Sequence, residues 1–422
     1  MLQVAYIRAH KEEVIERLAV KNFDAKEIIE ELIVLDERRR NTQSENDAIL
    51  AESNKLSKEI GELFKSGNVE QANAKKTETA LLKEKTKVLQ QVLSETQESL
   101  ERKLVQIPNI PNKSVPKGTS EQDNEVVSQE GEIPNLGENA KPHWELVAEK
   151  NIIDFELGVK ITGAGFPVYR GKGARMQRAL INYFLDKNIA AGYEEIMPPL
   201  LVNEASGFGT GQLPDKEGQM YHATEDNLYL IPTAEVPVTN IFRNVIVKKE
   251  DLPLKCTAYT PCFRREAGSY GKDVRGLNRL HQFDKVEIVQ IQHPDDSYKA
   301  LDVMVEDVAG ILRELGLPFR ILKLCGGDLG FTSALTFDFE VYSAAQEKWL
   351  EVSSVSNFES YQSNRLKLRF KDEDKKTTLC HSLNGSALAL PRIMAALIEN
   401  YQDAEGITIP EVLVPYCGFN KI

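Results

Sequence analysis

Apolar residues recur about every 3.5 positions between residues 27 and 105, among charged and amide side chains. That spacing places them in a seam along one side of a helix, and the segment contains no proline. A turn-favouring run at residues 65–68 separates two such seams. The pattern predicts an antiparallel helical coiled-coil hairpin whose arms of about 35 residues extend about 50 Å. The seam residues are Ile49, Leu56, Ile60 and Leu63, then Leu82, Leu89, Leu93, Leu100 and Leu104.

The pattern changes beyond the hairpin. Residues 106–140 contain four prolines among polar residues, which predicts a linker. Further on, the predicted strands outnumber the helices and long polar loops join them, which favours a mostly antiparallel sheet with flanking helices. The fold class is therefore α+β, with a helical arm at 1–105, a linker at 106–140 and a domain at 141–422 that is large enough to be catalytic. The strands are expected at 194–202, 228–232, 258–263, 280–291, 336–343 and 349–354, and the helices at 176–188, 295–315 and 387–401.

Charge is distributed unevenly along the chain. The formal net charge is −12, yet residues 1–105 carry 18 basic and 20 acidic side chains, so most of the acidity lies later. The overall acidity argues against a protein that coats polyanions, although a local basic surface stays compatible with it. Basic clusters in the hairpin, such as residues 38–40, indicate either a solvated helix face or an RNA contact. The hairpin itself is too thin for an active site, so it is either a dimerisation coiled coil or a reaching arm.

Cysteine and histidine usage points to a reduced setting. The five cysteines form no CxxC pair, and the six histidines form neither HxxxH nor HExxH. We therefore expect a cytoplasmic protein without disulfides or structural zinc. No stretch reaches the roughly 18 apolar residues that cross a bilayer, and the start lacks the pattern of a secretory signal, so we expect no membrane.

A strand, a polar basic loop and a second strand follow one another at residues 258–287. Alternation along the second strand places Phe283, Lys285 and Glu287 on one face. An aromatic ring, a cation and a carboxylate on one face suit a site for a flat base and a charged ligand. Neither GxGxxG nor a P-loop is present, so a standard nucleotide-binding helix terminus is not expected. Cys256 and Cys262 flank the first strand and are interpreted as small buried residues.

Several motifs together resemble the seryl-tRNA synthetase family of the class II aminoacyl-tRNA synthetases. Residues 263–266, Phe-Arg-Arg-Glu, are similar to motif 2, and residues 275–287 continue its seryl version. Residues 192–201 resemble motif 1, 232–237 the serine-recognition loop and 383–392 motif 3. The hairpin is similar to the family's tRNA-binding arm, so the likeness covers essentially the whole chain. Motif 3 departs from the family where Ala387 and Pro391 replace common glycines.

The resemblance implies ATP-dependent activation of serine to seryl-adenylate, followed by transfer to serine tRNA and, in this family, to selenocysteine tRNA. Neither step needs an enzyme nucleophile, because positioning and phosphate charge stabilisation lower the barrier. The guanidinium of Arg264 would hold the α-phosphate, Glu266 would accept from the adenine amino group and Phe283 would stack on adenine. Arg264, Arg392 and Glu266 are thus the catalytic candidates. The implied ATP-binding set also contains Arg265, Arg279, Val352 and Ser353.

Two of these roles carry open points. Arg392 would either cover adenine from its other side or reach the γ-phosphate. Glu351 and Ser354 would be the Mg²⁺ ligands that also contact ATP, but residues three apart lie on opposite faces of a regular strand. A bend or bulge near Val352 is therefore required if both touch one metal. Without the resemblance, Glu351 is an exposed strand carboxylate.

The resemblance also implies a serine pocket. Thr233 and Glu235 would hold the ammonium group, while Glu287 and Ser386 would lie near the hydroxyl. Alanine would leave the buried carboxylates unpaired, so the pocket would reject it. The other implied serine contacts are Ala234, Asn384 and again Arg264.

The implied partners are ATP, L-serine, a tRNA with a long variable arm, and a second copy of the chain that packs through motif 1. Two alternatives remain. A paralogue could load a carrier protein or activate another small amino acid, although such proteins generally lack the hairpin. A non-catalytic RNA-binding scaffold would have lost the phosphate-binding arginines, and Arg264 and Arg392 are both present.

Overall fold

The computed structural model describes residues 1–137, 140–215, 218–266 and 274–422. These residues form two compact units. The first comprises Met1–Ala19 and Phe23–Pro108, and the second comprises Val20–Asn22 and Asn109–Ile422.

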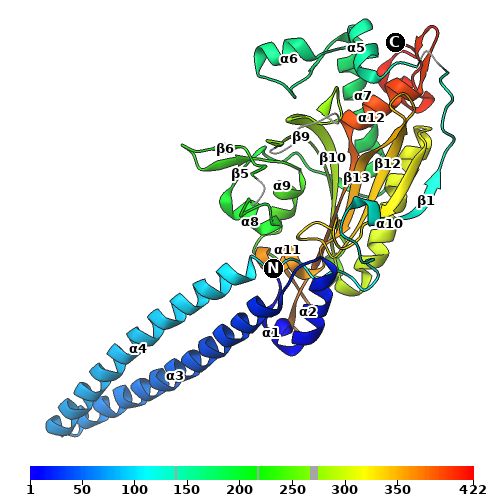
Figure 1. Ribbon diagram of the computed structural model, residues 1–422. Helices are drawn as coiled ribbons and strands as arrows, with labels where there is room; N and C mark the ends of the chain where they lie inside the picture. The colour runs from blue at the N-terminus through cyan, green and yellow to red at the C-terminus, as the bar shows by residue number, and fades with distance from the viewer. Residues whose placement is uncertain (138–139, 216–217, 267–273) are drawn as a thin grey trace. The chain divides into compact units, whose positions relative to one another are not determined.

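The first unit is the predicted helical hairpin. Helices α3 (Lys26–Lys65) and α4 (Val69–Leu104) run side by side in opposite directions, as Figure 1 shows. Two short helices, α1 (Val4–Ala9) and α2 (Lys11–Val20), precede them. The predicted seam is confirmed, since its residues are buried or half-buried between the two helices. Glu45 and Lys85 pair across the helices at 2.9 Å, which adds a polar contact on the outside of the seam.

The second unit is built on an eight-stranded sheet in the order β1-β11-β12-β13-β16-β10-β9-β4. All neighbouring strands are antiparallel except β4 and β9. The predicted antiparallel sheet is therefore confirmed. The strands are β1 (Glu125–Glu130), β4 (Glu194–Glu195), β9 (Leu254–Phe263), β10 (Gln282–Gln292), β11 (Phe319–Lys323), β12 (Leu335–Ser343), β13 (Lys348–Asn357) and β16 (His381–Ala389).

Shorter elements surround this sheet. The helices are α5 (His143–Glu149), α6 (Phe155–Ile161), α7 (Gly171–Ala190), α8 (Glu204–Thr210), α9 (Glu235–Asn240), α10 (Ser297–Glu314), α11 (Ser360–Leu366), α12 (Leu390–Asn400) and α13 (Val414–Cys417). The small sheets pair β2 (Ile153–Asp154) with β3 (Val168–Tyr169) and β17 (Gln402–Asp403) with β18 (Gly406–Ile407). They also join β5 (Leu201–Asn203), β6 (His222–Ala223) and β7 (Leu228–Leu230), and β8 (Ile246–Lys248), β14 (Arg369–Lys371) and β15 (Thr377–Leu379).

Helices α7, α10 and α12 cover one face of the large sheet (Figure 1). Alternation along β10 sends Val286 and Ile288 into the apolar core beneath these helices. Lys285 and Glu287 consequently lie on the opposite face, where α9 packs against β10. The apolar core thus lies between the sheet and these helices, and the polar side chains of β10 lie on the other face.

Three sequence-based expectations differ in detail from the structure. Residues 194–202 do not form one strand, because β4 joins the large sheet and β5 joins a small one. The helix expected at 387–401 begins only at Leu390, since residues 387–389 continue strand β16 as its pairing with β10 requires. The segment 106–140 contains β1, which pairs with β11 at the edge of the sheet.

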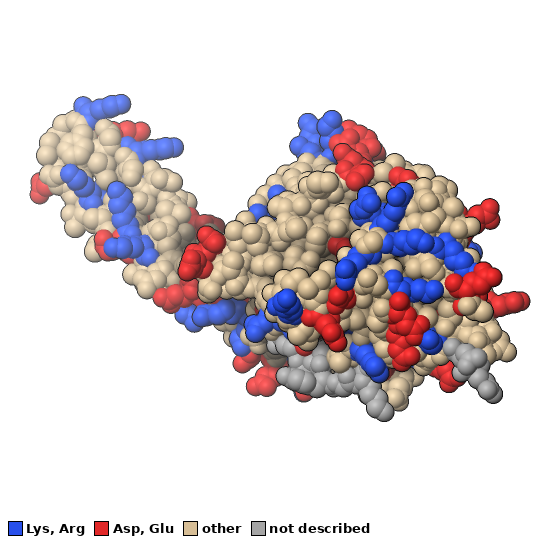
Figure 2. Space-filling view, turned by 90° about the horizontal axis from the view of Figure 1, so that it is seen from above, with Lys and Arg blue, Asp and Glu red and all other residues tan. Residues whose placement is uncertain are grey.

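The surface carries charges of both signs. On the face shown in Figure 2, lysine and arginine side chains are interspersed with aspartate and glutamate. In the part of the chain that the structure describes, no helix is both long and apolar enough to cross a membrane.

Candidate active site

Strands β9 and β10 form a hairpin that positions Arg264. Their register pairs Phe263 with Gln282, and the backbone amide of Arg264 donates to His281 O at 2.9 Å, which extends the ladder by one residue. The guanidinium of Arg264 lies over the ring of Phe283, 5.3 Å from its centroid. The sequence had predicted both residues for one nucleotide site, and the hairpin brings them into contact.

Arg265 and Glu266 follow at the end of β9. The amide of Arg265 donates to Gln219 O at 2.8 Å, and its side chain is exposed. The carboxylate of Glu266 is only 12% exposed and accepts a hydrogen bond from Arg279, a second predicted ATP-binding residue. The predicted loop at 267–273, which joins these positions, lies outside the described residues.

Arg392 lies in the first turn of α12, as predicted from its motif. Its Nε donates to Asn278 O at 2.9 Å, and its Nη1 donates to Glu351 O at 2.7 Å. The guanidinium is therefore fixed between β13 and the segment that leads into β10. The positive end of the α12 dipole adds to the attraction for an anion at this place.

The predicted serine-binding residues converge on a buried cluster. Lys285 pairs with Glu287 at 2.7 Å and donates to Thr233 Oγ1 at 2.8 Å. Both charged side chains are less than a tenth exposed. Glu287 and Ser386 are direct partners across β10 and β16, so their side chains share a face. Ala234 is also fully buried, at the start of α9.

Glu235 is the most perturbed group of this cluster. Burial, together with the negative charge of Glu287, raises the pKa of Glu235 to about 7. Hydrogen bonds from Gln362, at 2.6 Å, and from Asn384 oppose this rise. A carboxylate that sits near its titration point within a buried pocket is ready to gain a cationic partner.

Glu351 and Ser354 lie on the same face of the sheet, because β13 contains the bulge that the sequence required. Phe339 pairs with Ser353 but Glu340 pairs with Glu351, so Val352 is the extra residue. Asp338 pairs with Ser354, which places its carboxylate on that face as well. Burial, followed by the nearby charge of Glu351, raises the pKa of Asp338 well above its usual range.

The side chains of Val352 and Ser353 are not brought to this face. Val352 packs in the apolar core, and the hydroxyl of Ser353 donates to Ser386 O. Only the backbone of these two residues borders the polar face.

The sequence did not predict the full role of three residues of the site: Lys285, whose face was predicted but not its contacts with Thr233 and Glu287, then Gln362 and Asp338. Alternation had placed Lys285 on the correct face, but nothing local indicated its partners. Gln362 comes from α11, more than a hundred residues from the carboxylate it contacts. The third residue, Asp338, has a local signal. It is a polar residue within the apolar pattern of a strand, β12, and such a residue indicates a buried polar site.

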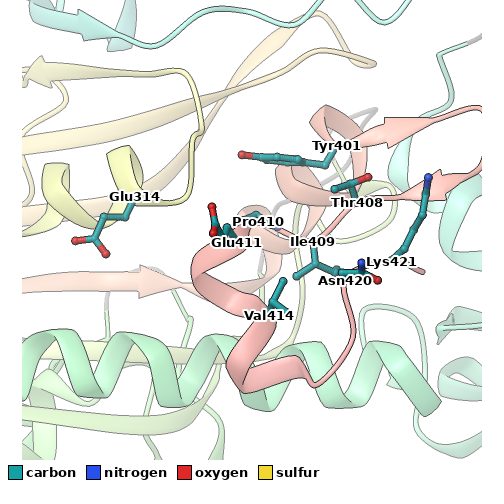
Figure 3. Close-up of a pocket in the computed structure, with 9 residues that line it drawn as sticks. All are labelled: Glu314, Tyr401, Thr408, Ile409, Pro410, Glu411, Val414, Asn420 and Lys421. Carbon is teal, nitrogen blue, oxygen red and sulfur yellow. The ribbon is translucent and has the colours of Figure 1, made fainter.

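A cavity of about 540 Å³ lies elsewhere, beside the C-terminal segment (Figure 3). Two of its polar groups contact the surrounding protein: the hydroxyl of Tyr401 donates to Leu315 O at 2.7 Å, and Lys421 pairs with Asp403 at 2.9 Å. None of the predicted site residues lines it. The lining residues are Glu314, Tyr401, Thr408, Ile409, Pro410, Glu411, Val414, Asn420 and Lys421.

The cysteines are buried, and the His, Cys, Asp and Glu side chains form no large cluster among the described residues. All five cysteines are buried and free, and for Cys256 and Cys262 this burial agrees with the interpretation from the sequence. Burial raises the pKa of Cys256 to about 11. Within the described ranges, no group of three or more His, Cys, Asp or Glu residues is placed to hold a metal ion.

An antiparallel sheet with arginines at its motif 2 hairpin and at the start of the following motif 3 helix defines a class II aminoacyl-tRNA synthetase. Comparison with known families agrees. The family model described as "tRNA synthetase class II core domain (G, H, P, S and T)" matches residues 219–401, and "Seryl-tRNA synthetase N-terminal domain" matches residues 1–111. The chain belongs to the seryl-tRNA synthetase family of aminoacyl-tRNA ligases.

Individual relatives support this membership over the full length. The chain is 49% identical to a serine–tRNA ligase of Salinibacter ruber, covering 100% of this chain and 99% of the relative. Among solved structures, it is similar to seryl-tRNA synthetase from Pyrococcus horikoshii complexed with ATP, with a TM-score of 0.93, 31% identity and coverage of 100% and 99%. The cytoplasmic enzyme of Naegleria fowleri in complex with AMP gives a TM-score of 0.87, 27% identity and coverage of 100% and 98%.

Proposed function

We propose that this chain activates L-serine with ATP to form seryl-adenylate and then transfers the seryl group to serine tRNA, with selenocysteine tRNA as a second acceptor. The observation that supports this most directly is the buried cluster of Thr233, Glu235, Lys285 and Glu287. It combines a carboxylate near its titration point with a second carboxylate that lies on the same face as Ser386.

In the first step the serine carboxylate attacks the α-phosphorus of ATP and pyrophosphate leaves. Arg264 would hold the α-phosphate, because a guanidinium can donate two parallel hydrogen bonds as charge builds on the oxygens. Phe283 would support the adenine ring and Glu266 would accept from its amino group. Arg279, which now pairs with Glu266, and Arg392 would hold the outer phosphates.

Serine would bind with its ammonium group at Glu235 and Thr233 and with its hydroxyl between Glu287 and Ser386. The ammonium replaces the proton that Glu235 otherwise shares at neutral pH. Lys285 orients Glu287 through their 2.7 Å ion pair. An alanine side chain would leave the buried acceptor of Glu287 without a donor, which costs about 1–3 kcal/mol and so discriminates against it.

A divalent metal is implied generally by an ATP-dependent class II synthetase. Glu351 and Ser354 would hold Mg²⁺ together with phosphate oxygens and water. The residues fit such an ion, since Asp338 faces the same side and its Oδ1 is buried without a hydrogen-bond partner among the described residues. The ion would neutralise phosphate charge.

The remaining partners follow from the same family membership. The hairpin of α3 and α4 would grip the long variable arm of the tRNA, largely through shape and backbone contacts. A second copy of the chain would pack through the motif 1 region, where Ile189, Met197 and Leu201 expose large apolar side chains. A reduced cytoplasm is the compartment that suits five free thiols.

Two assays on the full-length chain test the proposal. Serine-dependent exchange of pyrophosphate into ATP measures the first step, and charging of serine tRNA measures the second. We expect both activities, with serine preferred over alanine and threonine in the exchange assay. Exchange without tRNA charging would instead indicate a ligase that loads another carrier, and binding of tRNA without exchange would indicate a scaffold.

A further inference from the structure

A buried polar cluster lies outside the substrate pocket, where the start of α5 meets the end of α12. His143 and Glu399 are both fully buried there. His143 Nδ1 and its backbone amide both contact Glu399 Oε1, at 2.6 and 2.9 Å, and the hydroxyl of Ser343 donates to Glu399 Oε2. Burial raises the pKa of Glu399, but these hydrogen bonds outweigh it and hold the pKa below its usual value.

The other side of the imidazole contacts the chain just before β10. The backbone amide of Leu277 donates to His143 Nε2 at 2.8 Å. Because a backbone N–H can only donate, Nε2 must be an acceptor, so the imidazole is neutral and its proton is on Nδ1. His143 therefore bridges a buried carboxylate and the backbone of the segment 275–279, which we call the return segment.

The return segment is shaped to fit this imidazole. A Cβ added at Gly276 would lie 2.2 Å from His143 Nε2, and Gly276 has φ +67°. Both the space and the backbone conformation therefore require glycine at this position. The neighbouring Arg275 packs its guanidinium over the ring of Trp144, 4.8 Å from the centroid. His143 and Trp144, which are consecutive in α5, thus hold Leu277 and Arg275 of the return segment.

The same cluster reaches the phosphate-binding arginines. Gln346 donates to Glu399 Oε1 at 2.9 Å and accepts from Asn278 Nδ2 at 2.9 Å. The carbonyl of Asn278 in turn accepts from Arg392 Nε at 2.9 Å. Arg279, the next residue, pairs with Glu266. Hydrogen bonds therefore connect the buried imidazole through Glu399 and Gln346 to Asn278. The carbonyl of Asn278 holds Arg392, and Arg279 is its covalent neighbour.

We propose that His143 is a positioning residue whose neutral imidazole, oriented by Glu399, fixes the return segment so that Arg279 and Arg392 are preorganised for the phosphates of ATP. The inference rests on the proposed function. Preorganised donors need no reorganisation when the nucleotide arrives, so loosening their support weakens nucleotide affinity even though His143 touches no substrate.

Two substitutions separate positioning from a purely structural role. In His143→Asn the amide nitrogen replaces Nδ1, so the bond to Glu399 persists while the acceptor for Leu277 is lost. In His143→Gln the amide oxygen reaches the place of Nε2, so the acceptor for Leu277 persists while the bond to Glu399 is lost. His222→Asn, at an exposed imidazole, is the matched control.

We expect His143→Asn to raise the KM for ATP in the exchange assay about tenfold and to speed exchange of the Leu277 amide hydrogen by a similar factor. Its melting temperature should stay close to that of the wild type. His143→Gln should keep the KM within about twofold and lower the melting temperature more than His143→Asn does. His222→Asn should change none of these quantities.

The inference is overturned if His143→Asn leaves the KM for ATP and the Leu277 amide unchanged, or if both variants raise the KM equally in step with a loss of melting temperature. Failure of the proposed function looks different, because the wild type would then show no serine-dependent exchange. The hydrogen-exchange comparison needs no activity, so in that case it still decides whether His143 holds the return segment.

Discussion

Buried charged residues dominate the electrostatics of the proposed serine pocket. Glu235, Lys285 and Glu287 lie on adjoining elements with little contact with water, and the charge of Glu287 adds to burial in raising the pKa of Glu235. With two carboxylates and one ammonium, the cluster can be neutralised by one further cation. The ammonium group of an amino acid is such a cation. Glu235 is the group whose protonation must change when serine binds, because burial has raised its pKa to about 7.

The raised pKa of Glu235 predicts how serine binding depends on pH. Below pH 7 the carboxyl is protonated and must lose its proton before it can hold the ammonium group, so the KM for serine should rise up to about tenfold per pH unit. Above pH 7 the KM should level off. Glu235→Gln should raise the KM at pH 8 and abolish this dependence, and steady-state exchange between pH 5.5 and 8.5 measures both effects. A wild-type KM that is flat across pH 7 would contradict the assignment.

Arg264 provides the second prediction at this scale. Arg264→Ala should lower the rate of serine-dependent exchange about a thousandfold, since a fixed donor to the developing phosphate charge is lost, while the oligomeric state stays that of the wild type. Arg313→Ala is a suitable control, because Arg313 pairs with Glu130 and Glu306 on the surface. The control should keep its activity within about twofold. Near-normal exchange in Arg264→Ala would refute the role given to this side chain.

At the level of elements, irregular strand pairing places the candidate site residues on one face of the sheet. The bulge at Val352 turns Glu351 to the face that already carries Ser354 and Asp338. Continuous pairing of β10 with β9 keeps Lys285 and Glu287 on one face, although β10 is offset against β16 between the same two residues. The sheet therefore presents its polar residues on the side away from α7, α10 and α12.

Shortening the helical hairpin should separate serine activation from the charging of tRNA. The pairs Glu45–Lys85 and Glu59–Lys75 set the register of α3 against α4, so replacing residues 50–82 with a short Gly-Asn turn keeps the remaining seam aligned. Exchange should stay within about twofold, because the substrate pocket lies wholly in the second unit. Charging of serine tRNA should fall at least a hundredfold in kcat/KM, since the phosphate contacts of the outer arm are lost. Unchanged charging would show that the outer arm does not contact tRNA.

At the scale of the whole molecule, the two compact units match the two demands of the reaction. One unit holds the proposed substrate site on a sheet with its own apolar core, and the other is a long hairpin with a narrow seam. The net charge of −12 is therefore a poor guide to partners, because an RNA can be bound by a neutral arm and a few arginines.

The exposed apolar residues of motif 1 predict a homodimer. Met197 is 89% exposed in the single chain, and burying such a side chain stabilises an interface by about 1.5–3 kcal/mol. In a two-fold dimer the substitution Met197→Glu acts twice, so the dissociation constant should rise at least about a hundredfold. Analytical ultracentrifugation should then show monomer at concentrations at which the wild type is expected to be a dimer. Val303→Glu, at an exposed apolar residue of α10, should leave the dimer intact.

Much of this architecture could be predicted from the sequence. The hairpin was predictable because its seam and its turn are local patterns, and each candidate residue of the motifs could be named by its order along the chain. The boundaries at 194–202 and 387–401 were wrong where pairing with a distant strand ends an element. Local preference at those positions does not reveal the partner strand.

The sequence alone determined the helical arm, the class of sheet and the identities of the polar residues, because periodicity and turn chemistry act over a few neighbouring positions. Only the tertiary structure decided that Gln362 meets Glu235, that Asp338 faces Glu351, and that His143 holds the return segment. These contacts join residues far apart in the chain, or depend on a one-residue bulge that reverses a face. Burial then raises the pKa of Glu235 and of Asp338, and burial exists only once the chain has folded.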